Sequence, residues 1–565
     1  MDRQLKLSMA VPISTKSVGK PGQLHARQKQ RRQRQRRMLC CALLITFVAA
    51  GLLAYETKAP LAQTDAAYIP PMNTPPAEPA LGAGAAAGLP VADAAGQVAN
   101  PTPSAETSVP AAAAGLSVLN TPAASIDYGE NTPILYYAQS GDSMGVLAVR
   151  FGVETTEITS ADPLPTEGFI PEGQLLLIPD RLDETSANLK LFPDSEVVNS
   201  PSAVDFDVSA FVSQAGGYLA TYQEFVYGSG MMSGAAIIEK VAREFSIHPR
   251  LLLTLIEYES GWVYDMPQSR YQVNYPLGIN LGESVGLYHQ LEFAAGVLGT
   301  GYYGWREGTM MVLVFPNGEE LRLAAELNCG SVGLMYYFAQ QLNPLEWQAA
   351  LYAENSVFKT YQAMFGDPWL IAQEYEPLFT PNVVQPDLIL PFDIGVTWSL
   401  TVGPHAAWGA ADVRAALDFA PPSSAPGCET NYAWVNAAAD GLVVRSWDGT
   451  VVIDLDGDGF EQTGWNLIYL HVASFGRVAQ GTWVKAGDHL GHPSCEGGIA
   501  TGNHLHLVRK YNGEWVPAEG PLTFNLQGWK AKAGSQPLSG WLVKGDQIVR
   551  ASVVGGAASQ ITRAQ

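Results

Sequence analysis

The chain has 565 residues, too many for a single hydrophobic core, so we expect several domains. Its net charge is −21, yet residues 1–37 hold eleven Lys or Arg residues and only one acidic residue, so the remainder carries about −31. Binding to nucleic acid requires clustered cations that contact phosphates. The acidic body therefore argues against a nucleic acid partner.

An apolar stretch follows this basic head. Residues 38–54 are near the lower length limit of a membrane-spanning helix, and a run of arginines comes directly before them. Basic flanks stay on the cytoplasmic side. We therefore predict that residues 1–37 form a cytoplasmic head, that residues 38–54 form a single-pass anchor in the cell membrane, and that the bulk of the chain is extracytoplasmic. A cleaved signal peptide is the alternative.

A linker and a small module come next. Residues 55–131 are rich in Ala, Pro and Gly, which is typical of a flexible tether. Residues 132–182 predict two strands that enclose two helices, with the elements expected at 134–137, 144–151, 155–161 and 175–178.

The segments Tyr-Tyr-Ala-Gln-Ser-Gly-Asp-Ser-Met, ending at Met144, and Pro171-Glu-Gly-Gln-Leu-Leu-Leu-Ile-Pro resemble a LysM module. The resemblance implies a βααβ fold that binds the N-acetylglucosamine of peptidoglycan or chitin. The Asn that members usually carry near Ala161 is absent, so a purely structural module is the alternative.

Residues 200–385 are predicted to be mostly helical, because apolar residues recur at helical spacing at 235–245, 251–256 and 332–341. The segment from Leu251 to Trp262, which contains Glu-Ser-Gly, resembles the lytic transglycosylases, as do Gly-Leu-Tyr-His-Gln-Leu from Gly286 and Ala-Glu-Leu-Asn-Cys-Gly from Ala325. The resemblance implies a lysozyme-like fold in which Glu259 is the catalytic general acid.

Two alternatives stay open for this helical region. Glu257 is a second candidate acid, two residues away and therefore on another face of the helix. The region could also have lost activity and serve as a scaffold or glycan binder. For His248 and His289, ordinary structural roles are expected.

From residue 391 onward the pattern changes to short strands separated by Gly, Pro and Asp turns, which predicts an all-β domain over 391–550. The fold class is therefore multidomain α+β. Four segments contain the polar residues of interest: Leu417-Asp418-Phe-Ala-Pro, Ala438-Ala-Asp-Gly-Leu-Val-Val, Ile468-Tyr-Leu-His471-Val, and Thr501-Gly-Asn-His504-Leu-His506-Leu.

In this order the segments resemble the lysostaphin-type zinc metallopeptidases, which have a duplicated-hybrid-motif fold and act on peptidoglycan. By the resemblance, Asp418 and His506 are metal ligands, and His471 and His504 are catalytic. Protein ligands to a catalytic zinc leave one position open for water, whose pKa then falls towards neutrality. His504 and His506 are two residues apart on one strand, so both face the same side of a sheet.

One position departs from this pattern. Four residues before Asp418 stands Arg414, where the family has a His ligand. Arginine stays protonated and has no lone pair for a metal. His405 could replace the missing ligand, a weak site could form from Asp418 and His506 alone, or Arg414 could pair with Asp418 in a site without zinc.

Cysteines and acidic residues add two expectations. Cys428 and Cys495 fall in one domain outside the cytoplasm and are expected to form a disulfide, whereas Cys329 is expected to be buried and free. The run Asp454-Leu-Asp-Gly-Asp-Gly resembles the start of a calcium loop, but its twelfth position is Trp465. A tight hairpin is the better interpretation, and calcium is not expected.

Together these features predict a membrane-tethered hydrolase of peptidoglycan, a zinc metalloendopeptidase that acts on stem peptides or cross-bridges. A catalytically degenerate protein that binds the wall or activates other hydrolases is the alternative, and Arg414 fits that role. Binding of chitin or another exopolysaccharide is a third hypothesis.

Overall fold

The computed structural model describes residues 133–280, 284–380, 382–409, 413–422 and 427–565. The predicted cytoplasmic head, membrane span and linker lie outside these ranges, so their arrangement stays a prediction. Within the described ranges, no helix is both long enough and apolar enough to cross a membrane.

The first module contains a two-stranded antiparallel sheet. Strand β1 (Ile134–Tyr137) pairs with β2 (Leu175–Ile178), and helix α2 (Met144–Phe151) lies between them in sequence. The predicted second helix is wrong beyond a single 3₁₀ turn at Thr155–Glu157. The chain leaves the helical path because Thr159 pairs with Leu177 and extends the sheet instead.

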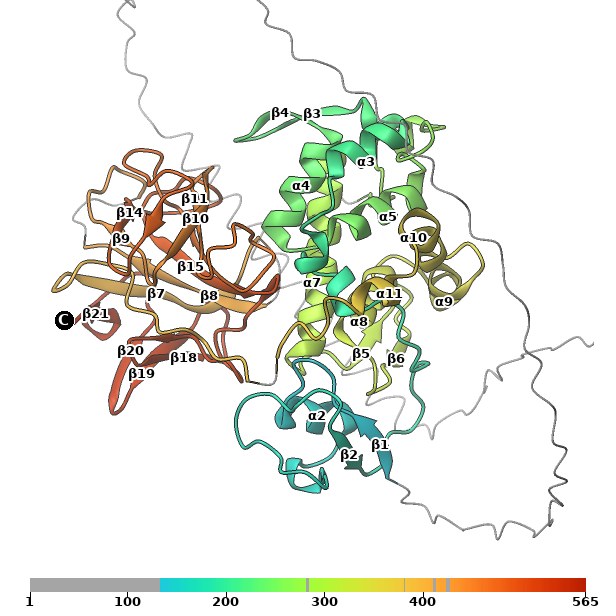
Figure 1. Cartoon of the computed structure of the whole chain (residues 1–565), viewed down its shortest axis with the longest axis horizontal. Helices are drawn as coiled ribbons and strands as arrows, with labels where there is room; N and C mark the ends of the chain where they lie inside the picture. Colours follow the sequence, from blue (N-terminus) through green and yellow to red (C-terminus); the bar gives the residue numbers. More distant parts are fainter. Residues whose placement is uncertain (1–132, 281–283, 381, 410–412, 423–426) are drawn as a thin grey trace, which may run out of the picture. The chain divides into compact units, whose positions relative to one another are not determined.

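The middle region is mostly helical, as predicted, and Figure 1 shows its long helices α4 and α7 side by side. Two small hairpins, β3–β4 and β5–β6, interrupt the helices. The elements are α3 (Val208–Ala215), β3 (Gln223–Val226), β4 (Gly230–Ser233), α4 (Gly234–Phe245), α5 (Pro249–Ser260), α6 (Arg270–Asn274), α7 (Leu287–Arg306), β5 (Val312–Val314), β6 (Glu320–Arg322), α8 (Cys329–Ala339), α9 (Pro344–Tyr352), α10 (Val357–Phe365) and α11 (Pro368–Ala372).

The C-terminal region is built on one antiparallel sheet with the order β13-β10-β11-β12-β15-β8-β7-β21, to which β16 adds by pairing with β15. The last strand extends the sheet beyond the predicted boundary at residue 550. The strands are β7 (Thr397–Ala406), β8 (Arg414–Ala420), β10 (Gly441–Trp447), β11 (Thr450–Asp454), β12 (Trp465–Leu470), β13 (Trp483–Val484), β15 (Leu505–Tyr511), β16 (Glu514–Trp515) and β21 (Gln560–Thr562).

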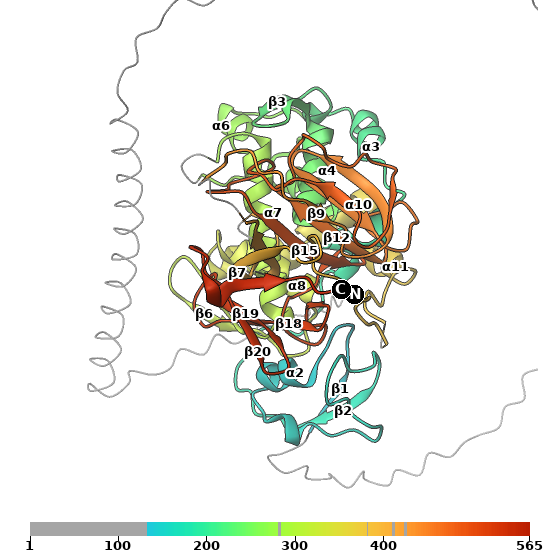
Figure 2. The same ribbon diagram turned by 90° about the vertical axis from the view of Figure 1, so that its left-hand side faces the viewer.

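Two smaller sheets complete the region. Strand β9 (Val435–Asn436) pairs with β14 (His489–Gly491). An accessory sheet packs on β7, and Figures 1 and 2 both show its strands grouped together. Its strands are β17 (Asn525–Leu526), β18 (Trp529–Ala533), β19 (Gly540–Lys544) and β20 (Gln547–Arg550).

The two faces of the main sheet pack into different cores. Neighbouring residues of a strand point to opposite faces. On β15, Leu507 joins the core inside the β region, and Val508 joins the core of the helical region. His506 shares the face of Val508, and Asp418 shares the face of Ala416, which also joins the helical core. The helical region therefore covers part of the face that carries these two polar residues.

Candidate metal centre

Three side chains from three adjacent strands converge at one point. The distance from His405 Nε2 to His506 Nδ1 is 3.1 Å, and each of these nitrogens lies 3.2 Å from Asp418 Oδ1. All three residues are largely buried, with side-chain exposures of 13%, 9% and 9% for His405, His506 and Asp418. The triangle brings together two of the predicted ligands and the histidine proposed as a replacement.

The outer nitrogens of the two imidazoles define their protonation. His405 Nδ1 lies 2.9 Å from the carbonyl oxygen of Gly403, and His506 Nε2 lies 3.0 Å from that of Ala407. A carbonyl oxygen only accepts hydrogen bonds, so each of these nitrogens carries the proton. The inner nitrogens then present lone pairs to each other and to the Asp418 carboxylate. A cation between the three atoms, either a metal ion or a proton, would stabilise this arrangement.

The size of the triangle fits zinc. Zinc binds nitrogen and carboxylate oxygen at about 2.0–2.2 Å in tetrahedral geometry, so neighbouring ligand atoms should be about 3.3 Å apart. Asp418 Oδ1 is also buried without a hydrogen bond, as expected of an atom that binds a metal. Carbonyl acceptors behind metal-binding histidines are the usual outer shell of such sites.

The pKa values of the three groups reflect burial and the charges of their neighbours. Burial alone would raise the pKa of Asp418, but His405 and His506 hold it well below its ordinary value. Burial alone would lower the pKa of His405, yet the Asp418 carboxylate raises it. Burial lowers the pKa of His506, which keeps this imidazole neutral.

An irregular strand places His405 in the site. Between the pairs Val402–Asp418 and His405–Ala416, β7 contains one residue more than β8, which is a β-bulge. Directly opposed residues share a face, so the bulge puts His405 on the face of Asp418. In a regular strand its side chain would point to the opposite face.

His471 and His504 lie beside this triangle. Their ring centroids are 4.4 Å apart, and His504 Nε2 lies 3.6 Å from Asp418 Oδ2. The Nδ1 atoms of both rings face carbonyl oxygens at 2.8 Å, those of Glu496 and Gly502, so the Nε2 atoms carry the lone pairs. Burial and then the neighbouring imidazoles lower the pKa of His471 to about 3, which keeps it neutral.

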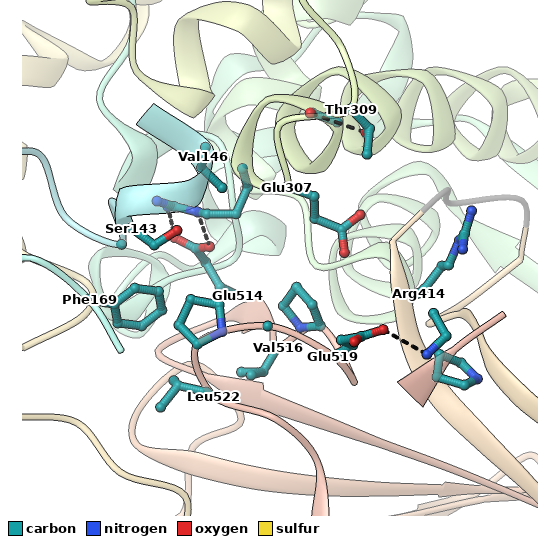
Figure 3. Close-up of a pocket in the computed structure, with 18 of the residues that line it drawn as sticks. Ser143, Val146, Phe169, Glu307, Thr309, Arg414, Glu514, Val516, Glu519 and Leu522 are labelled. Atoms are coloured by element: carbon teal, nitrogen blue, oxygen red, sulfur yellow. Dashed lines mark hydrogen bonds and ion pairs between the residues drawn. The ribbon is translucent and has the colours of Figure 1, made fainter. Parts of the chain in front are cut away.

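Arg414 does not pair with Asp418. It is exposed, its Nη1 donates to the carbonyl oxygen of Gly534 at 3.3 Å, and its side chain lines a separate cavity of about 480 Å³. Figure 3 shows Arg414 on one side of this cavity and Phe169 on the other. None of the lining residues belongs to the three-residue cluster. The predicted alternative of an Arg414–Asp418 salt bridge is therefore wrong.

The structure joins Cys428 to Cys495 in a disulfide and leaves Cys329 buried as a free thiol.

Asp454, Asp456 and Asp458 form a second acidic group with oxygens within 4.8 Å of one another. Asp454 uses both carboxylate oxygens to accept three backbone N–H groups of its own turn. This pattern is that of the hairpin turn predicted between β11 and β12.

In the helical region, the two candidate acids differ. Glu257 accepts hydrogen bonds from the backbone N–H groups of Val263 and Tyr264, which assigns it to the end of α5. Glu259 has no hydrogen-bond partner among the described residues, and burial raises its pKa to about 7. His248 is buried and caps α5, and His289 is exposed beside Glu292, so neither reaches a site.

Two protein-family models match parts of the chain. Residues 417–517 match the model of peptidase family M23. This part of the chain is therefore similar to the M23 peptidases. Residues 190–378 match the model of the LasA N-terminal domain, a match that the sequence motifs did not predict. Members of family M23 are zinc metallopeptidases, and the His405–Asp418–His506 cluster is a site of matching composition.

Among curated proteins, the chain is similar to Protease LasA from two strains of Pseudomonas aeruginosa. The identity is 28% over 303 residues, which cover 49% of this chain and 66% of the relative, just under two thirds of its length. Neither of the two family models covers the LysM-like module at residues 132–182.

Two solved structures are also similar. Pseudoalterin, described as a novel M23 metalloprotease from the deep sea, is 21% identical, with 30% of this chain and 96% of that chain covered and a TM-score of 0.25. The catalytic domain of the antimicrobial peptidase lysostaphin from Staphylococcus simulans is 21% identical, with 22% and 89% covered and a TM-score of 0.16.

Proposed function

We propose that this protein is a zinc-dependent endopeptidase whose metal ligands are His405, Asp418 and His506. The observation that supports this most directly is the convergence of two imidazole lone pairs and one carboxylate oxygen at 3.1–3.2 Å. His405 takes the place of the histidine that Arg414 replaces. In this proposal the ligand set is complete without residue 414, which argues against the alternative of a degenerate, metal-free binding protein.

In this proposal, His471 and His504 perform the proton transfers. Zinc in such a site acts as a Lewis acid and lowers the pKa of a bound water. The two rings lie 4.4 Å apart, and His504 Nε2 is 3.6 Å from Asp418 Oδ2, so their Nε2 lone pairs would accept a proton from the attacking water. Once protonated, either ring donates a hydrogen bond to the carbonyl oxygen of the scissile peptide as negative charge develops there.

We propose peptidoglycan peptides, either stem peptides or cross-bridges, as the substrate. The support is the lysostaphin-type motif order, the similarity to Protease LasA and the LysM-like module. That module would hold the glycan strand while the M23 domain cuts the peptides. The membrane anchor at residues 38–54 would keep this activity at the outer face of the cell membrane.

The replacement of His405 by alanine tests the ligand set. We expect the full-length protein to bind about one zinc per chain, measured by elemental analysis, and to release new amino termini from purified sacculi. The His405→Ala variant should lose both, because two ligands alone hold zinc weakly. His289→Ala, which removes an exposed histidine outside the site, should retain both.

A zinc content in His405→Ala equal to that of the wild type would show that His405 is not a ligand. Absence of zinc from wild-type protein prepared with excess zinc would exclude the metallopeptidase and favour the non-catalytic wall-binding protein.

Glu259 supports a second candidate function, cleavage of the glycan strand. A general acid for this reaction must stay protonated near neutral pH, and burial raises the pKa of Glu259 to about 7. Soluble anhydro-muropeptides should then appear from sacculi and disappear with Glu259→Gln but not with Glu292→Gln, a change in a partly exposed carboxylate. If the wild type releases none, the helical region is a scaffold.

A further inference from the structure

His471 has an unusual backbone conformation. Its φ angle is +64°, in the left-handed region that residues other than glycine rarely adopt. Such strain persists only where surrounding contacts enforce it, and it is common at functional sites. The contacts that enforce it here come mainly from one short segment, Ser494–Glu496.

This segment holds His471 at both its backbone and its ring. The backbone N–H and the Oγ of Ser494 donate to the carbonyl oxygen of His471 at 2.7 and 3.1 Å. The carbonyl oxygen of Glu496 accepts the Nδ1 proton of the ring at 2.8 Å. The hydrogen bond to Glu496 fixes the tautomer of the ring. The two hydrogen bonds from Ser494 fix the backbone and so the direction in which the His471 side chain points.

The segment is itself anchored twice. Cys495, its central residue, forms the disulfide with Cys428. The carboxylate of Glu496 accepts the backbone N–H of Ser474 with both oxygens, at 2.9 and 2.8 Å, and the Ser474 hydroxyl at 3.1 Å. Ser474 lies three residues after His471, so this second anchor closes a loop around the histidine.

The other end of the disulfide reaches the second histidine. The residues on either side of Cys428 accept hydrogen bonds from Asn503, which directly precedes His504. Gly427 accepts from the backbone N–H at 3.0 Å, and the carbonyl oxygen of Glu429 accepts from the side-chain amide. A single cross-link therefore connects the supports of His471 and His504.

We propose that Glu496 is a positioning residue and that the Cys428–Cys495 disulfide couples the orientations of His471 and His504. This inference rests on the proposed peptidase function. Neither Glu496 nor the disulfide forms a hydrogen bond or ion pair with the three proposed metal ligands, so the metal site can form without them. Their loss should affect the rate of the chemical step rather than zinc binding.

Two variants of the full-length, zinc-loaded protein test this proposal. Cys428→Ala/Cys495→Ala removes the cross-link, and Glu496→Ala removes the carboxylate anchor while keeping the disulfide. Outer-shell partners of metal sites typically contribute 10–100-fold to activity. We expect kcat for a soluble peptide substrate to fall by about 10- to 100-fold, with KM and zinc content close to wild type.

The matched control is Glu519→Gln. Glu519 also ties a backbone N–H, that of Ala533, but does so in the accessory sheet. The Glu519→Gln variant should therefore have the kcat of the wild type. Nitrogen-15 NMR of histidine-labelled protein gives a second readout: His471 should be a pure Nδ1–H tautomer in the wild type and a mixture in both variants.

An unchanged kcat, or a pure Nδ1–H signal in variants that retain zinc, would overturn the proposal. Loss of zinc in parallel with kcat would also overturn it, since the loop would then only stabilise the fold. If the wild type binds zinc but cleaves no peptide, the peptidase function fails, and the tautomer measurement still decides the positioning role.

Discussion

At the scale of single residues, the candidate metal centre gathers His405, Asp418 and His506 from three adjacent strands. Asp418, His471, His504 and His506 lie in short motifs whose spacing is visible in the chain, and the structure brings all four together. His405 could only be one of several alternatives. It lies thirteen residues before Asp418, and no spacing rule connects a residue at that distance to the site.

Glu259 allows a residue-scale prediction about stability. Its pKa in the folded protein is about 7, above the ordinary value of 4.5, because burial disfavours the charge. Between these two pH values the unfolded chain loses its proton while the folded protein keeps it. The carboxyl therefore costs stability as the pH rises from about 4.5 to about 7, and the cost stays constant above that.

Glu259→Gln should remove this cost. In urea unfolding, the stability advantage of the variant over the wild type should grow by up to about 3 kcal/mol between pH 4 and pH 8. Glu292→Gln, which changes a partly exposed carboxylate on α7, is the control for the substitution itself. A constant difference for Glu259→Gln across this pH range would contradict the raised pKa.

At the scale of elements, the periodic spacing of apolar residues predicted the regular secondary structure. The helix predicted at 235–245 is α4, because its apolar residues recur at the helical spacing of 3.6 residues. The bulge in β7 could not be predicted in this way. It breaks the two-residue period at the point where His405 must change faces, so alternation alone assigns this histidine to the wrong side.

The bulged strand depends on a close contact with the accessory sheet. A Cβ atom added to Gly403 would lie 2.7 Å from the Cα of Gly540 and 2.8 Å from the carbonyl oxygen of Ser539. Gly403→Val should therefore push β7 away from β19, cost about 1–3 kcal/mol and displace His405, two residues further on. Zinc affinity should fall together with stability.

Gly145→Ala is a suitable control for this change. Gly145 lies inside α2, and nothing approaches within 4 Å of its added Cβ. The substitution should be neutral or stabilise the helix by up to about 1 kcal/mol. Wild-type zinc affinity in Gly403→Val would show that the accessory sheet does not support the metal site.

At the scale of the whole molecule, the helical and β regions share a core. Trp515, on β16, is 1% exposed and belongs to the helical core. Its backbone N–H donates to the hydroxyl of Tyr303, and its indole N–H donates to the carbonyl oxygen of Phe245. Arg306 of α7 forms a buried ion pair with Glu514. An isolated β region would expose these groups, so experiments on the site require the full chain.

Trp515→Ala tests whether the two regions unfold as one unit. Truncation of a buried tryptophan typically costs about 3–5 kcal/mol. Trp515 joins both regions. We therefore expect two transitions to shift together to lower urea concentrations: the loss of helix, measured by circular dichroism, and the release of zinc. Trp483→Ala, which removes a half-exposed ring on β13, should leave both transitions near their wild-type positions. If zinc release shifts in Trp515→Ala while helix loss does not, the two regions fold independently, and the covered face of the sheet is then a separable interface.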